Sequence, residues 1–352
     1  MTECAVMEGL QARAYDACIP LNVSLELTLR CNIRCVHCYN FDRGAPREAS
    51  GAELSMEEIR ALLDDLRRAG TLFLSLTGGE AMSHPRFWEI LDEAAAREFA
   101  VTLLSNGTLL GERECERLAS YPNLWGTSLS VYGARAATHD AITRSPGSHR
   151  RTMDGARRLA ALGVTVNLKL VLMKGNAAEA GEMADQADAE GFSCAIDPAI
   201  TGRYDGTRGS LAERVDKGVL EQLYSGPLRS LVKAGKADPT DDEFKCNCAR
   251  GNAAVSCTGE VWPCIATPLR AGNIREQRFS EIWKESPVFQ RLRGLKVADF
   301  KTCAPGDRKA WCRRSPGPAY LLTGEYTAVD PWSCAEAEVI RDILARDTAP
   351  PS

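Results

Sequence analysis

Three cysteines, Cys31, Cys35 and Cys38, lie within eight residues of the segment LTLRCNIRCVHCYN at 27–40. Thiolates gathered this closely bind transition metals, and four of them complete either a structural zinc site or the ligand set of a [4Fe–4S] cluster. Three thiolates leave one metal position open. His37 lies between two of the cysteines and is the candidate fourth ligand if the metal is zinc. The spacing therefore indicates a metal site completed by either a histidine or an external molecule.

The segment before these cysteines, VSLELTL at 23–29, alternates apolar and polar residues as a strand does. It is followed by SMEEIRALLDDLRRAG at 55–70, where Ser55 and Glu58 have the spacing of a helical capping box. The pattern of a strand followed by a helix then repeats. Further strands are predicted at 72–77, 101–105, 127–131, 164–173 and 194–197, and further helices at 83–97, 110–120, 149–162 and 176–190.

Six such repeats predict an α/β fold with a parallel sheet, and the cysteine-rich segment after them predicts a second, metal-organised domain. Ligands of parallel sheets bind at the carboxyl ends of the strands. The three cysteines follow the first strand at that edge. We divide the chain into an N-terminal extension (1–20), a core (21–200), a helical connector (201–240) with a helix over 211–235, an auxiliary domain (241–335), and a C-terminal helix with a disordered tail (336–352).

The composition is that of an ordinary globular protein, with 352 residues, 44% hydrophobic and 26% charged residues and a net charge of −4. This charge argues against nucleic acid or an anionic membrane as the main partner. The N-terminus has no export signal and no long apolar run occurs, so we expect a cytoplasmic protein. In that reducing setting, the 14 cysteines are expected to bind metal rather than form disulfides.

The spacing Cys-x3-Cys-x2-Cys after a first strand, followed by the aromatic Tyr39, resembles the signature of the radical S-adenosylmethionine (SAM) superfamily. A second element, TGGEAM at 77–82, ends the predicted second strand and resembles the Gly-Gly-Glu element of that family. The resemblance implies that the three cysteines hold a [4Fe–4S] cluster whose fourth iron chelates SAM. It also implies that Gly78 and Gly79 allow close backbone approach and that Glu80 accepts hydrogen bonds from the SAM amino group.

Two further strand ends, SNGT at 105–108 and LSVYG at 129–133, resemble family positions that line the SAM pocket. By this resemblance Asn106, Ser130 and Arg144 are candidate SAM-binding residues; Asn106 can equally be a turn residue beside Gly107. The implied chemistry is reductive cleavage of SAM to a 5′-deoxyadenosyl radical, which takes a hydrogen atom from the substrate. The predicted protein is thus an oxidoreductase-type enzyme, with an electron donor such as flavodoxin or ferredoxin.

Seven cysteines follow residue 240, and their pattern resembles the SPASM extension of radical SAM enzymes. Cys248, Gly259 and Cys264 match its first part, but Gly306 and Pro316 stand where two cysteines are expected. The two resemblances imply a partial (β/α)6 parallel barrel followed by a cysteine-rich auxiliary-cluster domain with one or two auxiliary [4Fe–4S] clusters. We assign Cys246, Cys248, Cys257 and Cys264 to the first, and Cys303, Cys312 and Cys334 to the second, completed by Asp307 or left open. The alternative is that the second cluster is absent or replaced by zinc.

Cys194, on the predicted sixth strand, is a candidate hydrogen-atom donor if its side chain faces the barrel interior; otherwise it is a buried inert thiol. The segments at 166–176 and 196–206 and the SPASM-like end resemble peptide maturases. The favoured substrate is therefore a ribosomally synthesised peptide, which would be cross-linked, epimerised or oxidised.

Only about 20 residues precede the first predicted strand. A peptide substrate is therefore expected to need a separate leader-binding carrier protein. The alternative substrate is a small sugar-derived metabolite such as an aminoglycoside. A remote alternative is a non-catalytic Fe–S or zinc protein, which would have no use for the Gly-Gly-Glu element.

Overall fold

The computed structural model describes residues 3–42, 51–233, 246–313 and 315–348. Its centre is a nine-stranded sheet with the order β6-β5-β4-β3-β2-β1-β7-β8-β9. The strands are β1 (Asn22–Thr28), β2 (Phe73–Gly78), β3 (Ala100–Ser105), β4 (Leu124–Val131), β5 (Val166–Val171), β6 (Ser193–Asp197), β7 (Asn252–Val255), β8 (Glu260–Trp262) and β9 (Gly272–Asn273). The strands β1 to β6 are parallel, which confirms the predicted parallel α/β core.

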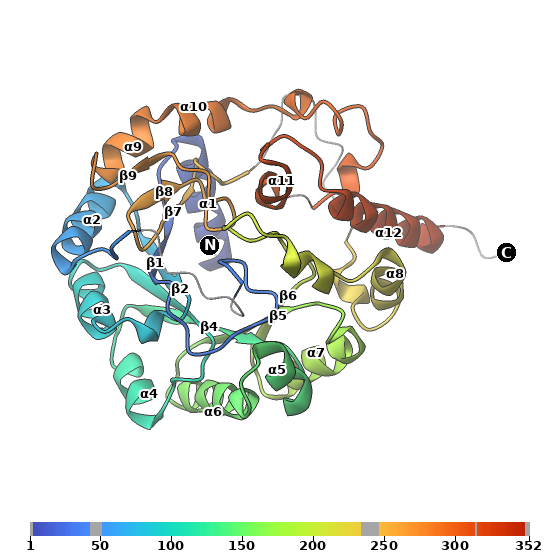
Figure 1. Cartoon of the computed structure of the whole chain (residues 1–352), viewed down its shortest axis with the longest axis horizontal. Helices are drawn as coiled ribbons and strands as arrows, with labels where there is room; N and C mark the ends of the chain where they lie inside the picture. The colour runs from blue at the N-terminus through green and yellow to red at the C-terminus, as the bar shows by residue number, and fades with distance from the viewer. Residues whose placement is uncertain (1–2, 43–50, 234–245, 314, 349–352) are drawn as a thin grey trace.

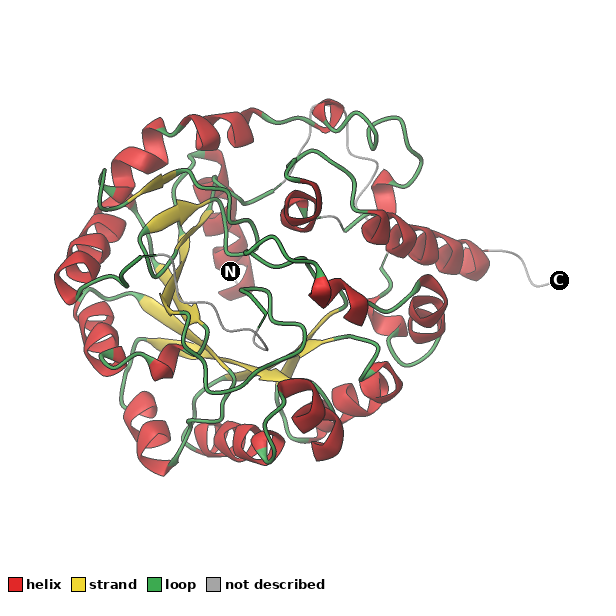
Figure 2. Ribbon diagram, in the orientation of Figure 1, coloured by secondary structure: helices red, strands yellow, loops and turns green. Residues whose placement is uncertain are grey.

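Helices surround the outer face of this curved sheet, as Figure 1 and Figure 2 show. The α-helices of the described residues are α1 (Glu3–Asp16), α2 (Met56–Ala69), α3 (Phe87–Ala96), α4 (Glu112–Ala119), α5 (Ala136–Thr143), α6 (Ser148–Ala161), α7 (Ala180–Ala189), α8 (Lys217–Ser225), α9 (Phe279–Glu285), α10 (Pro287–Gly294), α11 (Pro316–Thr323) and α12 (Pro331–Thr348). None of those in the described ranges has the length and apolarity needed to cross a membrane.

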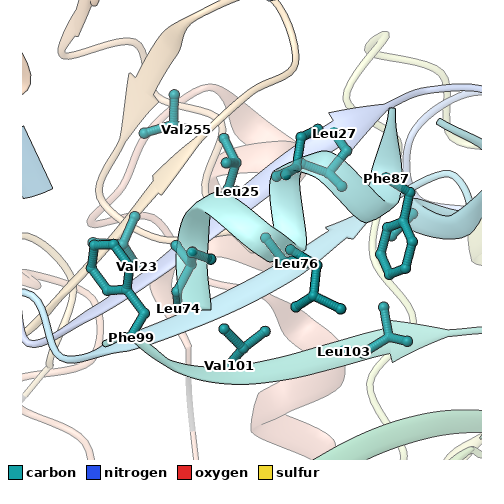
Figure 3. Close-up of a cluster of buried hydrophobic side chains, with 14 of the residues drawn as sticks. Val23, Leu25, Leu27, Leu74, Leu76, Phe87, Phe99, Val101, Leu103 and Val255 are labelled. Atoms are coloured by element: carbon teal, nitrogen blue, oxygen red, sulfur yellow. The ribbon is translucent and has the colours of Figure 1, made fainter. Parts of the chain in front are cut away.

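Strand alternation decides which side chains meet the helices. Val23, Leu25 and Leu27 of β1 point to the outer layer together with Leu74 and Leu76 of β2 (Figure 3). The intervening residues of each strand face the inside of the barrel because successive side chains alternate between the two faces. The inner face is therefore the one that presents polar groups to a ligand.

The cysteine-rich C-terminal segment continues the core sheet. Its first strand, β7, pairs in parallel with β1 through Val23↔Ala253 and Leu25↔Val255. The β7–β8 hairpin then adds to that edge in antiparallel fashion. The residues that follow the connector are thus hydrogen-bonded directly to the strand that leads into the three-cysteine loop.

Several elements differ from the sequence expectation. The N-terminal extension forms helix α1, and the helix predicted at 211–235 reduces to α8 with short 3-10 turns on either side. The helix predicted from Ser83 starts only at Phe87, because Ala81–Ser83 forms a separate 3-10 turn and Pro85 precedes the helix. The C-terminal helix extends over Pro331–Thr348, and the predicted disordered tail beyond it lies outside the described residues, as do residues 234–240 of the connector and 241–245 after it.

Candidate functional site

A cavity of about 290 Å³ lies at the carboxyl ends of the parallel strands. Its wall combines the three-cysteine loop, the ends of β2 to β6 and the segment after β8. It is lined by Cys31, Ile33, Cys35, His37, Cys38, Tyr39, Asn40, Thr77, Gly78, Gly79, Leu104, Ser105, Asn106, Ser130, Tyr132, Lys169, Val171, Asp197, Ala199, Ile200, Thr201, Tyr204, Ile265, Ala266 and Leu321. The structure therefore brings the three predicted cysteines, Gly78, Gly79, Asn106 and Ser130 to one cavity.

The three-cysteine loop is held by backbone hydrogen bonds to distant segments. The Arg34 and Val36 amides donate to the carbonyls of Thr143 and Ile142 at the end of α5. From the other side, the buried guanidinium of Arg203 donates to the Cys38 carbonyl over 3.2 Å. These contacts fix a loop that has no regular secondary structure of its own.

The donor set fits a thiophilic metal centre. Cys31, Cys35 and Cys38 all line the cavity. Asn106 approaches Cys31, with 3.7 Å between its side-chain nitrogen and the sulfur. Across the described ranges, no three His, Cys, Asp or Glu side chains are already gathered around a single point as in a closed metal site. The thiols thus surround an opening rather than close on each other.

Gly78 and Gly79 are required by the close approach of the chain that leads into the cysteine loop. The Gly79 amide donates to the Thr28 carbonyl over 2.7 Å, and the Glu80 amide donates to the Arg30 carbonyl over 2.8 Å. A Cβ atom on Gly79 would lie 2.6 Å from the Leu29 oxygen, and Gly78 has a φ of +135°. Larger residues would push the β1 and β2 ends apart just where both line the cavity.

Glu80 has a different place from the expected one. Its side chain is 1% exposed and does not line the cavity. The carboxylate accepts hydrogen bonds from the Asn106 amide at 2.7 Å, the Ser105 hydroxyl at 2.9 Å and the Met82 amide at 3.2 Å. Burial raises its pKa, and these donors oppose that rise. These hydrogen bonds tie Glu80, at the end of β2, to the end of β3.

The aromatic wall of the cavity keeps its titratable groups neutral. Burial lowers the pKa of His37 to about 4, and its ring packs edge-on against Tyr132 with 4.5 Å between centroids. Burial is also the largest cause of the raised pKa of Tyr132, while a hydrogen bond with Ser130 lowers it. The neutral imidazole of His37 has an Nδ1 atom without a hydrogen-bond partner among the described residues. His37 thus packs as an aromatic wall residue between the cysteines.

Two predicted site residues lie away from the cavity lining. Arg144 is an exposed residue in the left-handed conformation that ends α5, with a φ of 52°. Cys194 is exposed, and its register partner Leu168 belongs to the outer core. Paired residues of neighbouring strands face the same side of a sheet, so Cys194 points away from the barrel interior. The structure therefore gives the hydrogen-donor role of Cys194 no support.

Sequence reasoning missed Lys169 and Asp197. They come from β5 and β6, and they are the lysine and the aspartate in the described lining of the cavity. Lys169 Nζ lies 3.7 Å from an Asp197 carboxylate oxygen, and the Ala199 amide holds the other oxygen at 3.0 Å. Both side chains are a little under half exposed, at 46% and 43%. Strand alternation in VNLKLV contained the signal, since Leu168 and Leu170 face outward and leave Lys169 facing inward.

The first auxiliary set is only partly assembled. The Cys248 thiol hydrogen-bonds to those of Cys246 and Cys264, and these bonds raise its pKa and lower the pKa values of its two neighbours. The three thiols are linked in pairs, with Cys248 in the middle. They lie at the open end of the β7–β8 hairpin, where Cys248 precedes β7 and Cys264 follows β8.

Cys257 does not join this set. It lies in the turn of the β7–β8 hairpin, at the opposite end from Cys248 and Cys264, so the four residues of β7 separate them by roughly 13 Å. Its side chain is 2% exposed, and burial raises its pKa to about 12. Its carbonyl accepts from the Leu54 amide. The hairpin geometry therefore corrects the four-cysteine assignment to three cysteines.

The second auxiliary set gathers around α12. Burial raises the pKa of Cys334, and the nearby Cys303 adds to that rise. Cys312 directly follows the 3-10 helix Lys309–Trp311, which packs against α12. Asp307 is 71% exposed and pairs with Arg341 at 3.0 Å. Its carboxylate is thus held at the surface by an arginine and does not complete this set.

An aromatic bridge joins the two cysteine-rich regions. Tyr204 packs between Tyr39, at 5.1 Å, and Trp262, at 5.5 Å between ring centroids. Its amide donates to the Tyr39 carbonyl at 2.8 Å, and its hydroxyl donates to the carbonyl of Ile265. Tyr39 follows Cys38 and Ile265 follows Cys264, so a molecule in the cavity lies between the two regions.

Comparison with protein families matches residues 25–187 to the radical SAM superfamily and residues 246–314 to an iron–sulfur cluster-binding domain, SPASM. The subtilosin biosynthesis protein AlbA of Bacillus subtilis is 30% identical over 341 residues, which cover 93% of this chain and 73% of AlbA. The chain belongs to the radical SAM superfamily. Its cofactors are therefore iron–sulfur clusters and SAM.

Two further relatives of this radical SAM enzyme are similar over most of their length. The AdoMet-dependent heme synthase of Methanosarcina barkeri is 29% identical, with 89% of this chain and 96% of the relative covered. The mycofactocin maturase MftC of Mycobacterium tuberculosis is also 29% identical, with 89% and 81% covered.

Among solved structures, SuiB of Streptococcus suis bound to its precursor peptide superposes with a TM-score of 0.62 at 16% identity. The superposition covers 85% of this chain and 74% of that one. At this identity the likeness shows a shared fold.

Proposed function

We propose that Cys31, Cys35 and Cys38 hold the [4Fe–4S] cluster that binds SAM, and that this enzyme modifies a ribosomally synthesised peptide. When bound, the cluster and SAM supply the radical that removes a hydrogen atom from the substrate. The observation that carries the proposal is the shared cavity, which is lined both by these thiols and by Ile265 and Ala266 beside the auxiliary site. A substrate in it would touch both regions.

The residues that line the cavity are proposed to have different roles in binding. Gly78 and Gly79 give backbone access beside the cysteine loop, and Asn106 and Ser130 offer polar side chains on the neighbouring strand ends. Tyr132, His37 and Tyr204 supply neutral aromatic walls that exclude water. Exclusion of water protects a reactive intermediate from side reactions.

Lys169 and Asp197 are proposed to orient the substrate. Lys169 has two N–H donors beyond the one directed at Asp197, and Asp197 is held by the Ala199 amide. Since the rest of the wall is neutral, a charged or polar group of the substrate gains most by meeting this pair. The residues that bind SAM and those that orient the substrate are thus predicted to lie on different strands.

The peptide substrate is supported by AlbA and MftC, since these two relatives are named for bacteriocin biosynthesis and mycofactocin maturation. A second candidate has a specific observation in its favour, because the heme synthase relative matches 89% of the chain. A heme precursor is therefore the small-molecule alternative. A low-potential electron donor such as flavodoxin or ferredoxin and, for a peptide, a separate leader-binding protein complete the proposed partners.

The test is anaerobic reconstitution with iron and sulfide, followed by SAM and a reductant, with a Cys31→Ala variant as control. Short peptides encoded beside this protein are then offered in one set of assays and heme-precursor porphyrins in another. Mass spectrometry is expected to show a mass change in a peptide that depends on SAM and on Cys31. A mass change confined to the porphyrin would replace the peptide proposal with the second candidate.

A further inference from the structure

The auxiliary site formed by Cys246, Cys248 and Cys264 lacks a fourth thiolate, and the structure shows where the gap lies. Pro316, which stands at the expected cysteine position, is the first residue of α11. The start of α11 is packed tightly against the turn that follows Cys264, because a Cβ atom on Gly317 would lie 2.7 Å from the Thr267 hydroxyl. The family position therefore reaches this site but brings no ligand atom.

The same segment brings a different group to the three thiols. Tyr326 follows α11, is 5% exposed and belongs to the main hydrophobic cluster. Its phenol oxygen lies 3.8 Å from the Cys246 sulfur. Burial raises the pKa of Tyr326, and all three thiols, Cys248 first, add to the rise. The phenol is thus close to every cysteine of the set.

We propose that Tyr326 is the fourth protein group of this auxiliary site. Its phenol covers the side left open at Pro316 and donates a hydrogen bond to the sulfur of Cys246. The inference rests on the proposed function in one respect, namely that these cysteines bind an iron–sulfur cluster. Tyr326 is a positioning residue, because it acts through Cys246 and is not itself placed as a metal ligand.

The direction of the hydrogen bond follows from metal binding. A metal-bound thiolate has no proton, so Cys246 can only accept and Tyr326 must donate. A hydrogen bond to a ligating sulfur favours the more negative, reduced state of a cluster and raises its reduction potential. The ring also fills the position at which water or a small anion would otherwise reach an iron without a thiolate.

The hydroxyl of Thr267 is the other polar side chain at this site. Its oxygen lies 3.5 Å from the Cys264 sulfur, and the hydroxyl would donate to that sulfur once the thiolate binds a metal. It belongs to the same turn as Cys264 and lies on the side where α11 is packed. Tyr326 therefore contacts the sulfur of Cys246, while Thr267 contacts the sulfur of Cys264.

The test uses the reconstituted full-length chain and the electron paramagnetic resonance component that disappears in a Cys246→Ala/Cys264→Ala variant. In Tyr326→Phe, the ratio of reduced to oxidised cluster at a fixed potential is expected to fall about tenfold, or about 59 mV for a one-electron couple. Added cyanide is expected to shift this component in Tyr326→Leu, which removes the ring, and to leave the wild-type component unchanged. Tyr320→Phe is the matched control, because Tyr320 on α11 packs against the hydrophobic core.

Both changes are required. An unchanged ratio in Tyr326→Phe, cyanide binding already in the wild-type protein, or no cyanide effect in Tyr326→Leu would each overturn the proposal. If one of the two variants fails to incorporate iron, the criterion of the other variant and cyanide addition to the wild-type protein still decide. The production of 5′-deoxyadenosine by the same wild-type sample tests the proposed function separately, since it depends on Cys31, Cys35 and Cys38.

Discussion

The cavity cysteines and the auxiliary cysteines present the same chemistry in two different constructions. Each region has three thiols and one position without sulfur. In the cavity, the three thiols come from one loop of eight residues and face an opening of about 290 Å³. In the first auxiliary site, two ends of a hairpin bring the thiols together, and a buried tyrosine lies against them. The position without a thiolate is thus accessible in the cavity, whereas in the first auxiliary site it is covered by a side chain.

The supporting residues differ in the same way. Around the cavity, Gly78, Gly79 and Glu80 fix the backbone of the strand ends while leaving the space between them empty. Around the auxiliary site, the start of α11 and Tyr326 fill the space. Access to the position without a thiolate therefore depends on the packing around it, at β2 with Gly78 and Gly79, and not on the number of cysteines.

The largest expected effect is in the cavity. Cys35→Ala removes one of three thiolates from a site with no spare ligand, so SAM cleavage should fall to the background level. Cys115→Ala is the control, because Cys115 is a core thiol on α4 whose pKa is raised by burial to about 11. Chromatographic measurement of 5′-deoxyadenosine checks this. Substantial cleavage by Cys35→Ala would show that the cavity cysteines do not form the SAM-binding site.

A smaller loss of SAM cleavage is expected from a substitution at Gly79, at the end of β2. Gly79→Ala places a methyl group 2.6 Å from the Leu29 oxygen and must move the cysteine loop. Because a displacement of about 1 Å can cost about a hundredfold in rate, we expect roughly that loss of SAM cleavage. Gly294→Ala, where a Cβ atom would meet nothing within 4 Å, is the control. Equal rates of SAM cleavage in the two variants would show that Gly79 does not position the cysteine loop.

Among the residues that support the cavity, Glu80 is expected to contribute to the stability of the folded protein. Glu80→Ala leaves the Asn106 amide, the Ser105 hydroxyl and the Met82 amide without their acceptor. At roughly 1–3 kcal/mol for each buried donor, the free energy of unfolding should fall by about 3 kcal/mol or more. Urea unfolding of the iron-free protein measures this. A change below about 1 kcal/mol would indicate that Glu80 is free to meet a ligand instead.

The smallest effect concerns the contact between the two regions. Arg275, after β9, pairs with Glu58 at the start of α2, and its hydrogen bond lowers the pKa of Glu58 to about 2. This pair is partly exposed, so Arg275→Ala should cost only about 1 kcal/mol at pH 7. Because the folded-state pKa of Glu58 is below its ordinary value of 4.5, the contribution is present above pH 4.5 and is lost as the pH falls towards 2.

Urea unfolding of wild-type and Arg275→Ala protein at pH 7 and pH 3 checks this expectation. The difference in unfolding free energy between the two proteins should shrink at the lower pH. The exposed Arg291 on α10 provides the control substitution, Arg291→Ala. A difference that stays constant with pH would mean that the Glu58 carboxylate contributes nothing to the contact.

The sequence was most informative where structure is local. Alternation and helical periodicity predicted the six parallel strands and most core helices, and the capping box of Ser55 and Glu58 is present in the structure. Cys31, Cys35 and Cys38 are close in sequence, so their spacing alone predicted that they lie together in one site. The same holds for Gly78 and Gly79, which end a strand beside that wall.

Long-range packing explains what the sequence did not reveal. Cys257 lies between Cys248 and Cys264 in sequence, but the hairpin turn carries it to the opposite end. Asp307 depends on a partner 34 residues away, Arg341, which holds it at the surface. The hydrogen bonds that join Glu80 to the end of β3 cannot be identified from its own segment. Such placements follow from tertiary contacts that spacing does not encode.

The most direct test of the central claim is SAM cleavage by a Cys246→Ala/Cys248→Ala/Cys264→Ala variant in the absence of substrate. The central claim is that the cavity and the auxiliary site are separate three-thiol centres on one sheet. We therefore expect the variant to lose about four irons per chain but still to form 5′-deoxyadenosine at a rate close to that of the wild-type protein. Loss of cleavage to the Cys35→Ala level in a folded protein that keeps its remaining iron would contradict it.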